Sequence, residues 1–449
     1  MDFVTELAKK ISEKSGRTFY VGGYVRDSIL GIPNKDIDIE VHGIPVEDLK
    51  NILLEFGEIK LVGESFGVFR VGHYDVDISL PRTEVSIGDG HRDFEVDVDP
   101  FIGTKLASKR RDFTINALMK DVLTGEIIDE WNGLKDLENK VIRHIDSLTF
   151  IEDPLRVLRA AGFASRFDFK IATETIILSS AMNITELPKE RVFEEISKVF
   201  LKSKQPSIFF ETLIDMVQLS SWFEEVENLI YVPQSSEHHP EGNVWNHTMI
   251  ALNNAASKLE EAENPLAFMF SVLCHDFGKI VSTEEVEGKI KSIGHDIEGV
   301  IITETFLDRI TNEKALKKIV LNHVELHMRP NMMIKRSRKK SLMKLWDSSV
   351  CPNDLILLAY ADKYNRYDDQ DVITALQRRS LQEYEDLILQ PQVMGADLVK
   401  LGLKPSPQFS EILEFTHKLH LAGVDKEDAI KHAIGSFKLR RKINADERD

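Results

Sequence analysis

A glycine pair followed by two spaced aspartates is the feature that most constrains the fold of this chain. Gly22-Gly23 precedes Arg26, and Asp36 and Asp38 begin an apolar-flanked run that ends at Val41. A Gly-Gly turn leaves backbone N–H groups open to phosphate oxygens, and an arginine adds a charge-assisted donor. Because side chains alternate along a strand, the two aspartates point to one face. The pattern predicts a site for two divalent cations that clamp a phosphoryl transfer, whereas either motif alone would favour an ordinary surface hairpin.

Two further motifs follow in the same order along the chain. Residues 110–118 read RRDFTINAL, and residues 152–159 read EDPLRVLR. With these blocks the chain resembles the bacterial class II tRNA nucleotidyltransferases (CCA-adding enzymes) and their poly(A) polymerase relatives, from about Tyr20 to Arg166. The resemblance implies an α+β fold, in which a polymerase-β-like head with a small mixed sheet and helices precedes an all-helical neck and body.

The resemblance also implies roles for residues of the head. Asp36 and Asp38 become catalytic ligands of Mg²⁺. Asp77 becomes a third catalytic carboxylate, with Asp75 on the same run as the alternative. The implied substrates are CTP and ATP, and the implied partner is tRNA. The nucleotide-binding residues that the resemblance implies are Gly23, Arg26, Arg111, Asp112, Asn116, Asp153, Arg156 and Arg159, among which Arg111 and Asp112 recognise the ribose.

The chemistry of base selection can be argued from two of these residues. Asp153 and Arg156 are three apart at the expected start of a helix, so they share a face. An ionised Asp accepts hydrogen bonds and an Arg donates them. Cytosine and adenine both present an amino donor beside a ring-nitrogen acceptor, whereas guanine and uracil present a carbonyl beside an N–H. The pair predicts acceptance of CTP and ATP without a template, although Asp153 before Pro154 is also a good helix N-cap.

A second chemistry is expected after residue 231. The order His247, His275-Asp276, Asp362 resembles the HD phosphohydrolase superfamily. His295, His323 and Asp296 are the expected further ligands or orienting groups, and His323 shares a helix face with His327. Imidazoles and carboxylates suit Mn²⁺, Ni²⁺ or Mg²⁺. The resemblance implies a metal-dependent phosphohydrolase that acts on 2′,3′-cyclic or 2′-phosphate ends of RNA, although a single histidine is more often structural than a ligand.

Length and composition agree with a large intracellular enzyme. We expect a head at 1–140, a helical neck at 141–230, an HD domain at 231–385 and a helical tail at 386–449. The formal net charge of −17 argues against indiscriminate nucleic-acid binding. Two cysteines, Cys274 and Cys351, suit a reducing compartment, and no apolar run is long enough for a membrane span. The chain is expected to be cytoplasmic, as a monomer or homodimer.

The pattern also predicts individual elements. We expect a helix over residues 1–16, strands at 19–21, 36–41, 69–71, 74–79 and 126–129, and a helix opened by the motif at 110–118. Residues 83–100, with Gly88 and Gly90, favour a surface loop. The resemblance implies that a loop here helps the pocket change from CTP to ATP, so its retained length predicts addition of the final A.

Four alternatives remain open at this stage. Enzymes that add only CC or only A, and poly(A) polymerases, share the head motifs. An HD nucleotidase whose head merely binds nucleotide and a non-catalytic tRNA-binding protein are the other two. The paired carboxylates Asp36 and Asp38 argue against both of these, because a binding module has no need of them.

Overall fold

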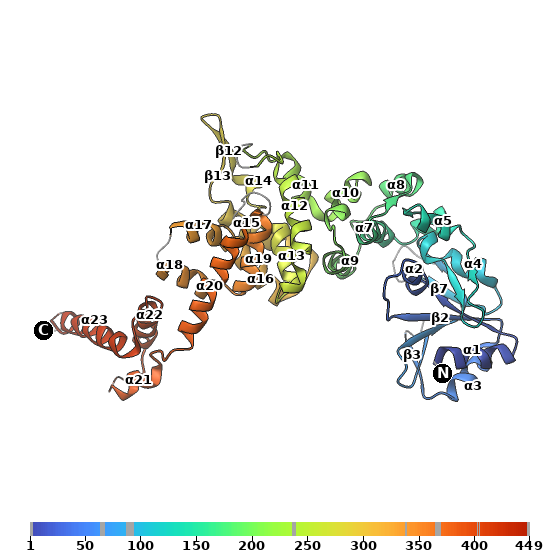
Figure 1. Cartoon of the computed structure of the whole chain (residues 1–449), viewed down its shortest axis with the longest axis horizontal. Coiled ribbons are helices and arrows are strands. Elements are labelled where there is room, and N and C mark those ends of the chain that lie inside the picture. Colours follow the sequence, from blue (N-terminus) through green and yellow to red (C-terminus); the bar gives the residue numbers. More distant parts are fainter. Residues whose placement is uncertain are drawn as a thin grey trace. The chain divides into compact units, whose positions relative to one another are not determined.

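The chain forms two compact units, Met1–Trp222 and Phe223–Asp449. The structure is a computed structural model, shown in Figure 1, and it describes residues 3–62, 68–86, 94–235, 239–336, 339–363, 370–401, 403 and 405–446. Among those residues, no helix combines the length and apolar character that crossing a membrane requires.

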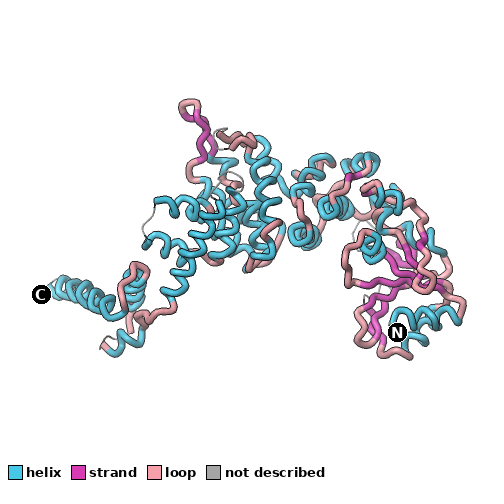
Figure 2. The backbone as a smooth tube through the Cα atoms, in the orientation of Figure 1, coloured by secondary structure: helices cyan, strands magenta, loops and turns pink. Residues whose placement is uncertain are grey.

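A seven-stranded mixed sheet forms the centre of the first unit (Figure 2). In spatial order its strands are β3 (Ile59–Val62), β4 (Val68–Val71), β5 (Val76–Ser79), β2 (Ile37–His42), β1 (Arg17–Val21), β8 (Met119–Asp121) and β9 (Ile127–Ile128). β2 and β5 run parallel, and the other neighbours run antiparallel. The parallel register places Asp38 opposite Asp77.

The sheet is held by apolar side chains at alternate positions. In β2, Ile39 and Val41 are fully buried and join one cluster with Leu7 of α1 (Phe3–Glu13) and Leu53 of α3 (Val46–Leu54). Because the strand period is two, Asp38, Glu40 and His42 lie on the other face. The core therefore fixes which face of β2 carries polar groups.

Two predicted elements of the head differ from the structure. Residues expected as a loop include a hairpin of β6 (Arg82–Ser86) and β7 (Phe94–Val98), while residues 87–93 lie outside the described residues. The motif at 110–118 does not open a helix. It follows α4 (Gly103–Lys109), runs extended at Phe113, which bridges to His144, and ends in the 3₁₀ turn η1 (Thr114–Asn116).

The head also contains α2 (Gly23–Ile29) and α5 (Gly133–Glu138). The helices that follow it in the first unit are α6 (Ser147–Ile151), α7 (Leu155–Phe167), α8 (Thr173–Ser180), α9 (Lys189–Lys202) and α10 (Ser207–Asp215), and α11 (Ser220–Asn228) begins at the end of this unit. A small parallel pair, β10 (Val141–Ile142) and β11 (Lys170–Ile171), interrupts them. Val157, Leu158, Ala161 and Ala164 form the buried stripe of α7, which packs against α9 and α10.

The second unit is built around α13 (Pro265–Cys274). Every residue of α13 from Ala267 onward is buried, as expected for a helix that is apolar on all sides. It packs against α12 (Val244–Ala256), α16 (Lys314–Leu326) and α19 (Pro352–Lys363). The unit consists of η2 (Leu229–Tyr231), α12 (Val244–Ala256), η3 (Leu259–Glu261), α13, α14 (Lys279–Ser282), α15 (His295–Ile310), α16 (Lys314–Leu326), α17 (Met328–Arg336), α18 (Lys339–Ser348), α19 (Pro352–Lys363), α20 (Gln370–Ile388), α21 (Gly395–Lys400), α22 (Gln408–His420) and α23 (Lys426–Asp446). One hairpin, β12 (Thr283–Val286) and β13 (Lys289–Ser292), projects from it (Figure 1). The predicted fold class is confirmed, with this hairpin and the β10–β11 pair added to the helical part.

Candidate functional sites

Three carboxylates meet at one end of the head sheet. Asp38 on β2 lies opposite Asp77 on β5, and Asp36 directly precedes β2. Partial desolvation raises the pKa of Asp38; the charge of Arg111 opposes this shift, and the charges of Asp77 and Asp36 add to it. Such mutual repulsion is what a bound divalent cation relieves. Asp75 is exposed ahead of β5, and Asp77 is paired with Arg70.

The glycine turn lies directly beside these carboxylates. Gly22 adopts a left-handed conformation with φ of 68°, and Gly23 begins α2. A Cβ placed on Gly22 would come within 3.0 Å of Nη1 of Arg111 and 3.9 Å of Oδ2 of Asp38. Only glycine therefore leaves the backbone open at the point where the predicted phosphate cradle, Arg111 and Asp38 converge.

A buried glutamate holds the two arginines of the second motif. Oε2 of Glu40 lies 3.4 Å from Arg110 and 3.9 Å from Arg111, and its Oε1 lies 2.9 Å from Nε2 of His42. Burial works against the charged form, but the hydrogen bond from His42 and the charge of Arg111 outweigh it, so the pKa of Glu40 is lowered. We did not predict Glu40 from the sequence, although its place two residues after Asp38 on the same strand face was the available signal.

Four of the predicted nucleotide-binding residues form one hydrogen-bonded chain. Asp112 accepts from Asn116 at 2.8 Å and from Arg159 at 2.7 Å. Asn116 in turn accepts from Arg26. Burial alone would raise the pKa of Asp112, yet the charge of Arg159 and the hydrogen bond from Asn116 lower it. The chain joins α2, η1 and α7, so these side chains are fixed relative to one another.

Two phenylalanines that the sequence analysis missed border this chain. The guanidinium of Arg26 lies 5.1 Å from the ring centre of Phe163 and 4.7 Å from that of Phe167. Arg159 lies 5.3 Å from the ring centre of Phe163. Their spacing of four residues on α7 was the available signal, because such residues share a helix face.

The predicted base-reading pair makes a helix-capping contact and further contacts with neighbouring segments. Asp153 accepts the N–H of Leu155 at 3.2 Å, as a helix-start residue does, and its other oxygen accepts from Arg191 of α9 at 3.2 Å. Arg156 donates to the backbone carbonyls of Thr149 and Arg110. The base-reading role stays a prediction, and these contacts fix both side chains against the second motif and α9.

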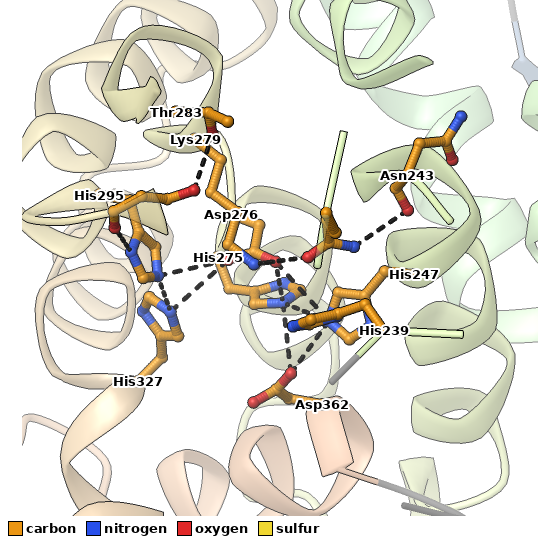
Figure 3. A network of polar contacts seen from close by, with 12 residues as sticks. His239, Asn243, His247, His275, Asp276, Lys279, Thr283, His295, His327 and Asp362 are labelled. Carbon is orange, nitrogen blue, oxygen red and sulfur yellow. Dashed lines mark hydrogen bonds and ion pairs between the residues drawn. The ribbon is translucent and has the colours of Figure 1, made fainter. Parts of the chain in front are cut away.

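Two groups of fully buried ligand-type side chains lie within the second unit (Figure 3), and a third, partly buried group of His239, Glu241 and His247 adjoins the first through His247. The first group is His247, His275 and Asp362, and the second is Asp276, His295 and His327; within each group the candidate ligand atoms lie within 4.8 Å of one another. His247 lies on α12, the His275-Asp276 pair follows α13, His295 begins α15, His327 follows α16, and Asp362 ends α19.

Asp276 faces both groups, one oxygen toward each. Its Oδ2 lies 3.3 Å from His275 and 3.6 Å from His247, and its Oδ1 lies 3.5 Å from His295 and 3.9 Å from His327. Burial would raise the pKa of Asp276, but the charges of His275 and Lys279 hold it well below its ordinary value. A carboxylate that favours its ionised form, with one oxygen toward each group, suits the binding of divalent cations there.

A tight backbone contact brings the second group to the first. A Cβ on Gly278 would lie 1.9 Å from the carbonyl oxygen of His295, so only glycine allows the start of α15 to approach the His275-Asp276 turn. Packing therefore explains why the fourth residue of the sequence His275-Asp276-Phe277-Gly278-Lys279 is a glycine.

The donor set fits divalent metal ions. Nε2 of His247 lies 3.3 Å from Nε2 of His275, and Nε2 of His295 lies 3.2 Å from that of His327. Nδ1 of His275, His295 and His327 each lies 2.7 Å from a backbone carbonyl, which can only accept, so these Nδ1 atoms carry the proton. When these rings are neutral, their Nε2 lone pairs face the neighbouring ring, an arrangement that a cation stabilises. Burial disfavours the charged form of His275, but the charges of Asp276 and Asp362 outweigh it and raise its pKa, so a cation would take the place of a proton there. Burial lowers the pKa of His327 to about 3, which keeps this ring in the form that binds metal.

The structure does not bring His323 to either group, and this corrects the expectation for that residue. Its Nδ1 contacts the hydroxyl of Ser271 at 3.0 Å, and its Nε2 donates to the carbonyl of Cys351 at 3.0 Å. Both ring nitrogens are used within the core, so no lone pair remains for a metal. His327, one turn further on, occupies the place that we expected for His323, while Asp296 lies on the first turn of α15 outside both groups.

A cavity of about 200 Å³ opens beside the two groups. Gln234, His239, Ser292 and two lysines contribute to its wall. Lys279 donates to Asp276 at 2.7 Å, and Lys363 lies 3.0 Å from Asp362. Cations flanking a carboxylate and imidazole cluster suit a phosphate group at this position.

Comparisons with known proteins match families to both parts of the chain. Residues 18–143 match the poly A polymerase head domain family, residues 166–230 match the probable RNA and SrmB-binding site of polymerase A, and residues 244–367 match the HD domain family. A multifunctional CCA protein of Mannheimia succiniciproducens is 34% identical over 389 residues, which cover 82% of this chain and 90% of that protein.

Solved structures show the same fold at lower identity. A Thermotoga maritima CCA-adding enzyme complexed with tRNA is 21% identical with a TM-score of 0.61, and the match covers 97% of this chain and 94% of that one. A Bacillus stearothermophilus CCA-adding enzyme in complex with CTP is 18% identical with a TM-score of 0.65, covering 98% of each chain.

Fold and sites together define a nucleotidyltransferase head of the poly A polymerase type in one chain with an HD domain. The 34% identity, over 82% of this chain and 90% of the Mannheimia protein, is high enough to identify the family. The chain belongs to the family of multifunctional CCA proteins.

Proposed function

We propose that this protein adds CMP and AMP from CTP and ATP to the 3′ end of tRNA and so builds or repairs the CCA terminus. The observation that carries the proposal is the placement of Asp38 opposite Asp77, beside the Gly22 turn and Arg111. Family membership over most of the chain supports it, as do solved relatives of like fold that hold tRNA or CTP. Because tRNA is a cytoplasmic substrate, we propose that the protein acts in the cytoplasm.

The proposed division of the chain follows the sequence. The head occupies 1–140, the neck with the base-reading motif 141–230, the HD domain 231–385 and the helical tail 386–449. The family matches at 18–143, 166–230 and 244–367 support this division. Each boundary between two proposed domains lies within about twenty-five residues of an end of a match.

The residues of the head divide the work of nucleotide transfer. Asp36, Asp38 and Asp77 would hold Mg²⁺, which supplies activation of the tRNA 3′-hydroxyl and neutralises the triphosphate. The backbone at Gly22 and Gly23 binds phosphate oxygens, and Arg111, held by Glu40, adds a positive charge there. The nucleoside is oriented by the hydrogen-bonded chain of Arg26, Asn116, Asp112 and Arg159. Pyrophosphate is released when the nucleotide is joined to the tRNA.

Base selection rests on Asp153 and Arg156. The contacts of Asp153 with Arg191, and of Arg156 with the carbonyl of Arg110, fix the acceptor and the donor relative to the second motif. An acceptor next to a donor matches the edges of cytosine and adenine and leaves guanine and uracil with unpaired groups, which is how such sites discriminate.

Asp38→Asn tests the head directly. The substitution keeps the shape of the side chain and removes the charge that a cation needs, so nucleotide addition should fall by at least a hundredfold. Asp75→Asn, at an exposed position before β5, is the matched control and should keep the wild-type rate. Addition near the wild-type rate in Asp38→Asn would overturn the assignment.

We further propose that the HD domain is a metal-dependent phosphohydrolase for phosphoesters at RNA ends. Asp276, with one oxygen toward each histidine pair, carries this proposal. The two groups would hold Mn²⁺, Ni²⁺ or Mg²⁺, which supplies a hydroxide nucleophile at neutral pH. Lys279 and Lys363 line the adjoining cavity and attract the phosphate.

Asp276→Asn tests this second activity. Hydrolysis of 2′,3′-cyclic and 2′-phosphate nucleotides should be lost while CCA addition remains. Wild-type protein that hydrolyses none of these esters with any of the three metals would contradict the proposal.

A further inference from the structure

We infer that Glu241 is the positioning residue of the HD metal centre: its carboxylate holds His247 so that Nε2 of that ring faces the cations. The inference rests on the proposed metal centre and assigns a role to a residue outside both ligand groups. The four clustered imidazoles, those of His247, His275, His295 and His327, are held in two different ways.

Three of the four rings are held by the backbone of their own chain segment. Nδ1 of His275, His295 and His327 each lies 2.7 Å from the carbonyl oxygen three residues earlier, on Val272, Ser292 and Val324. A backbone carbonyl accepts the Nδ1 proton and leaves Nε2 as the ligand atom. No side chain is needed for this arrangement.

His247 is held differently from the other three. Its Nδ1 lies 3.1 Å from Oε1 of Glu241, while its Nε2 lies 3.0 Å from Asp362 and 3.3 Å from His275. The carboxylate thus takes the part that a carbonyl takes elsewhere in the cluster.

The position of Glu241 is itself fixed. Its backbone carbonyl accepts the side-chain N–H of Asn246 at 2.8 Å, and Asn243 caps α12 by accepting the N–H of the same residue. The Glu241 side chain is 11% exposed. The loop that carries Glu241 is therefore tied to the first turn of the helix that carries His247.

The same carboxylate oxygen also reaches the wall of the cavity. Nδ1 of His239 lies 3.2 Å from Oε1 of Glu241. The rings of His239 and His247, both labelled in Figure 3, have centres 5.3 Å apart and meet edge to face. His239 lines the cavity beside the metal groups. Glu241 thus connects the cavity wall to one metal ligand.

Three variants separate position from charge. Glu241→Ala removes the acceptor, and loss of such an orienting group typically lowers metal affinity ~10–100-fold. Glu241→Gln keeps an acceptor oxygen at the same reach, so we expect it to retain most of the affinity. Glu241→Asp keeps the charge but shortens the side chain by one methylene, so its affinity should fall toward that of the alanine variant.

The test measures Mn²⁺ binding to metal-free full-length protein by calorimetry at pH 7.5. Glu298→Ala, which removes an exposed carboxylate on the first turn of α15, is the control for loss of negative charge and should bind as the wild type does. CCA addition and thermal unfolding, measured on the same preparations, verify that each variant is folded.

The outcomes distinguish this inference from the proposed metal centre. If Mn²⁺ binds the wild type no better than it binds His275→Ala, the metal centre itself is refuted. If the wild type binds and Glu241→Ala binds equally well, the positioning role is refuted. A glutamine variant as weak as alanine beside an aspartate variant that binds normally would assign the effect to charge and also overturn the inference.

Discussion

His323 should behave as a buried, structural histidine whose titration opposes folding in mild acid. Burial lowers its pKa from 6.5 to about 4 in the folded protein. Because the folded pKa lies below the unfolded one, the unfolded chain takes up the proton first as the pH falls. Stability from this group is therefore complete above about pH 6.5 and is lost progressively as the pH falls toward 4.

The size of the loss follows from the two pKa values. At pH 5 the pH lies about 1.5 units below the unfolded pKa of 6.5, and each unit corresponds to about 1.36 kcal/mol. Protonation therefore stabilises the unfolded chain, while the folded ring is still neutral. The folded state should therefore lose about 2 kcal/mol between pH 7.5 and pH 5 through His323 alone. Burial outweighs the hydrogen bond to the carbonyl of Cys351 and the charge of Asp354, which both raise the pKa of His323, and so the neutral ring is retained.

His323→Gln isolates this contribution, because glutamine offers a donor and an acceptor but does not titrate. Urea unfolding of both proteins, with metal removed by a chelator, gives their free energies of unfolding at the two pH values. Other titrating groups contribute to both chains and cancel. The variant should lose about 2 kcal/mol less than the wild type over this range. Equal losses in the two proteins, or weaker Mn²⁺ binding by the variant, would refute the structural assignment.

Three further predictions concern the head. Glu40→Gln removes the charge that faces Arg111 at 3.9 Å and weakens the charged hydrogen bond from Arg110; because hydrogen bonds to charged groups contribute ~1.5–3 kcal/mol, kcat/KM for CTP and ATP should fall about tenfold, which steady-state kinetics would measure. Asp153→Ala should lower kcat/KM for CTP and ATP together and raise incorporation of UTP and GTP, whereas unchanged selectivity with reduced thermal stability would leave Asp153 only its capping role. Deleting Ser86–Glu95 should leave CC addition nearly intact and stall before AMP, and a gel that shows complete CCA would refute the role of this segment.

Local patterns were sufficient for much of the fold. The amphipathic residues 1–16 form α1 over Phe3–Glu13, and the apolar run before His275 forms α13. In β2 the alternation of polar and apolar residues follows directly from the strand period, and it places Asp38 away from the core.

Elements that depend on remote partners were not predictable in the same way. The motif at 110–118 carries a helix-like pattern, yet Phe113 pairs with His144 and Thr114 donates to the carbonyl of Arg143, so the backbone stays extended there. The glycines within residues 83–100 favour a loop, whereas the residues on either side of them pair as β6 and β7.

The choice between His323 and His327 shows the same limit at the site. Both residues lie on one face of a helix, so spacing alone treats them as equal. Ser271 and Cys351, which are distant in sequence, pack against His323 and use both of its nitrogens, whereas His327 meets His295 and Asp276. Which of the two can bind metal is thus set by tertiary packing.

Stepwise extension of tRNA is the most direct test of the central proposal. Transcripts that end before the first C, after CC and after CCA are incubated with CTP, ATP or both, and the products are resolved on a gel. We expect CTP alone to add two residues to the first transcript, ATP alone to add one residue to the second, and both together to complete CCA and stop. Failure to extend any transcript, arrest after CC with ATP present, or long A tails would contradict CCA addition by this protein.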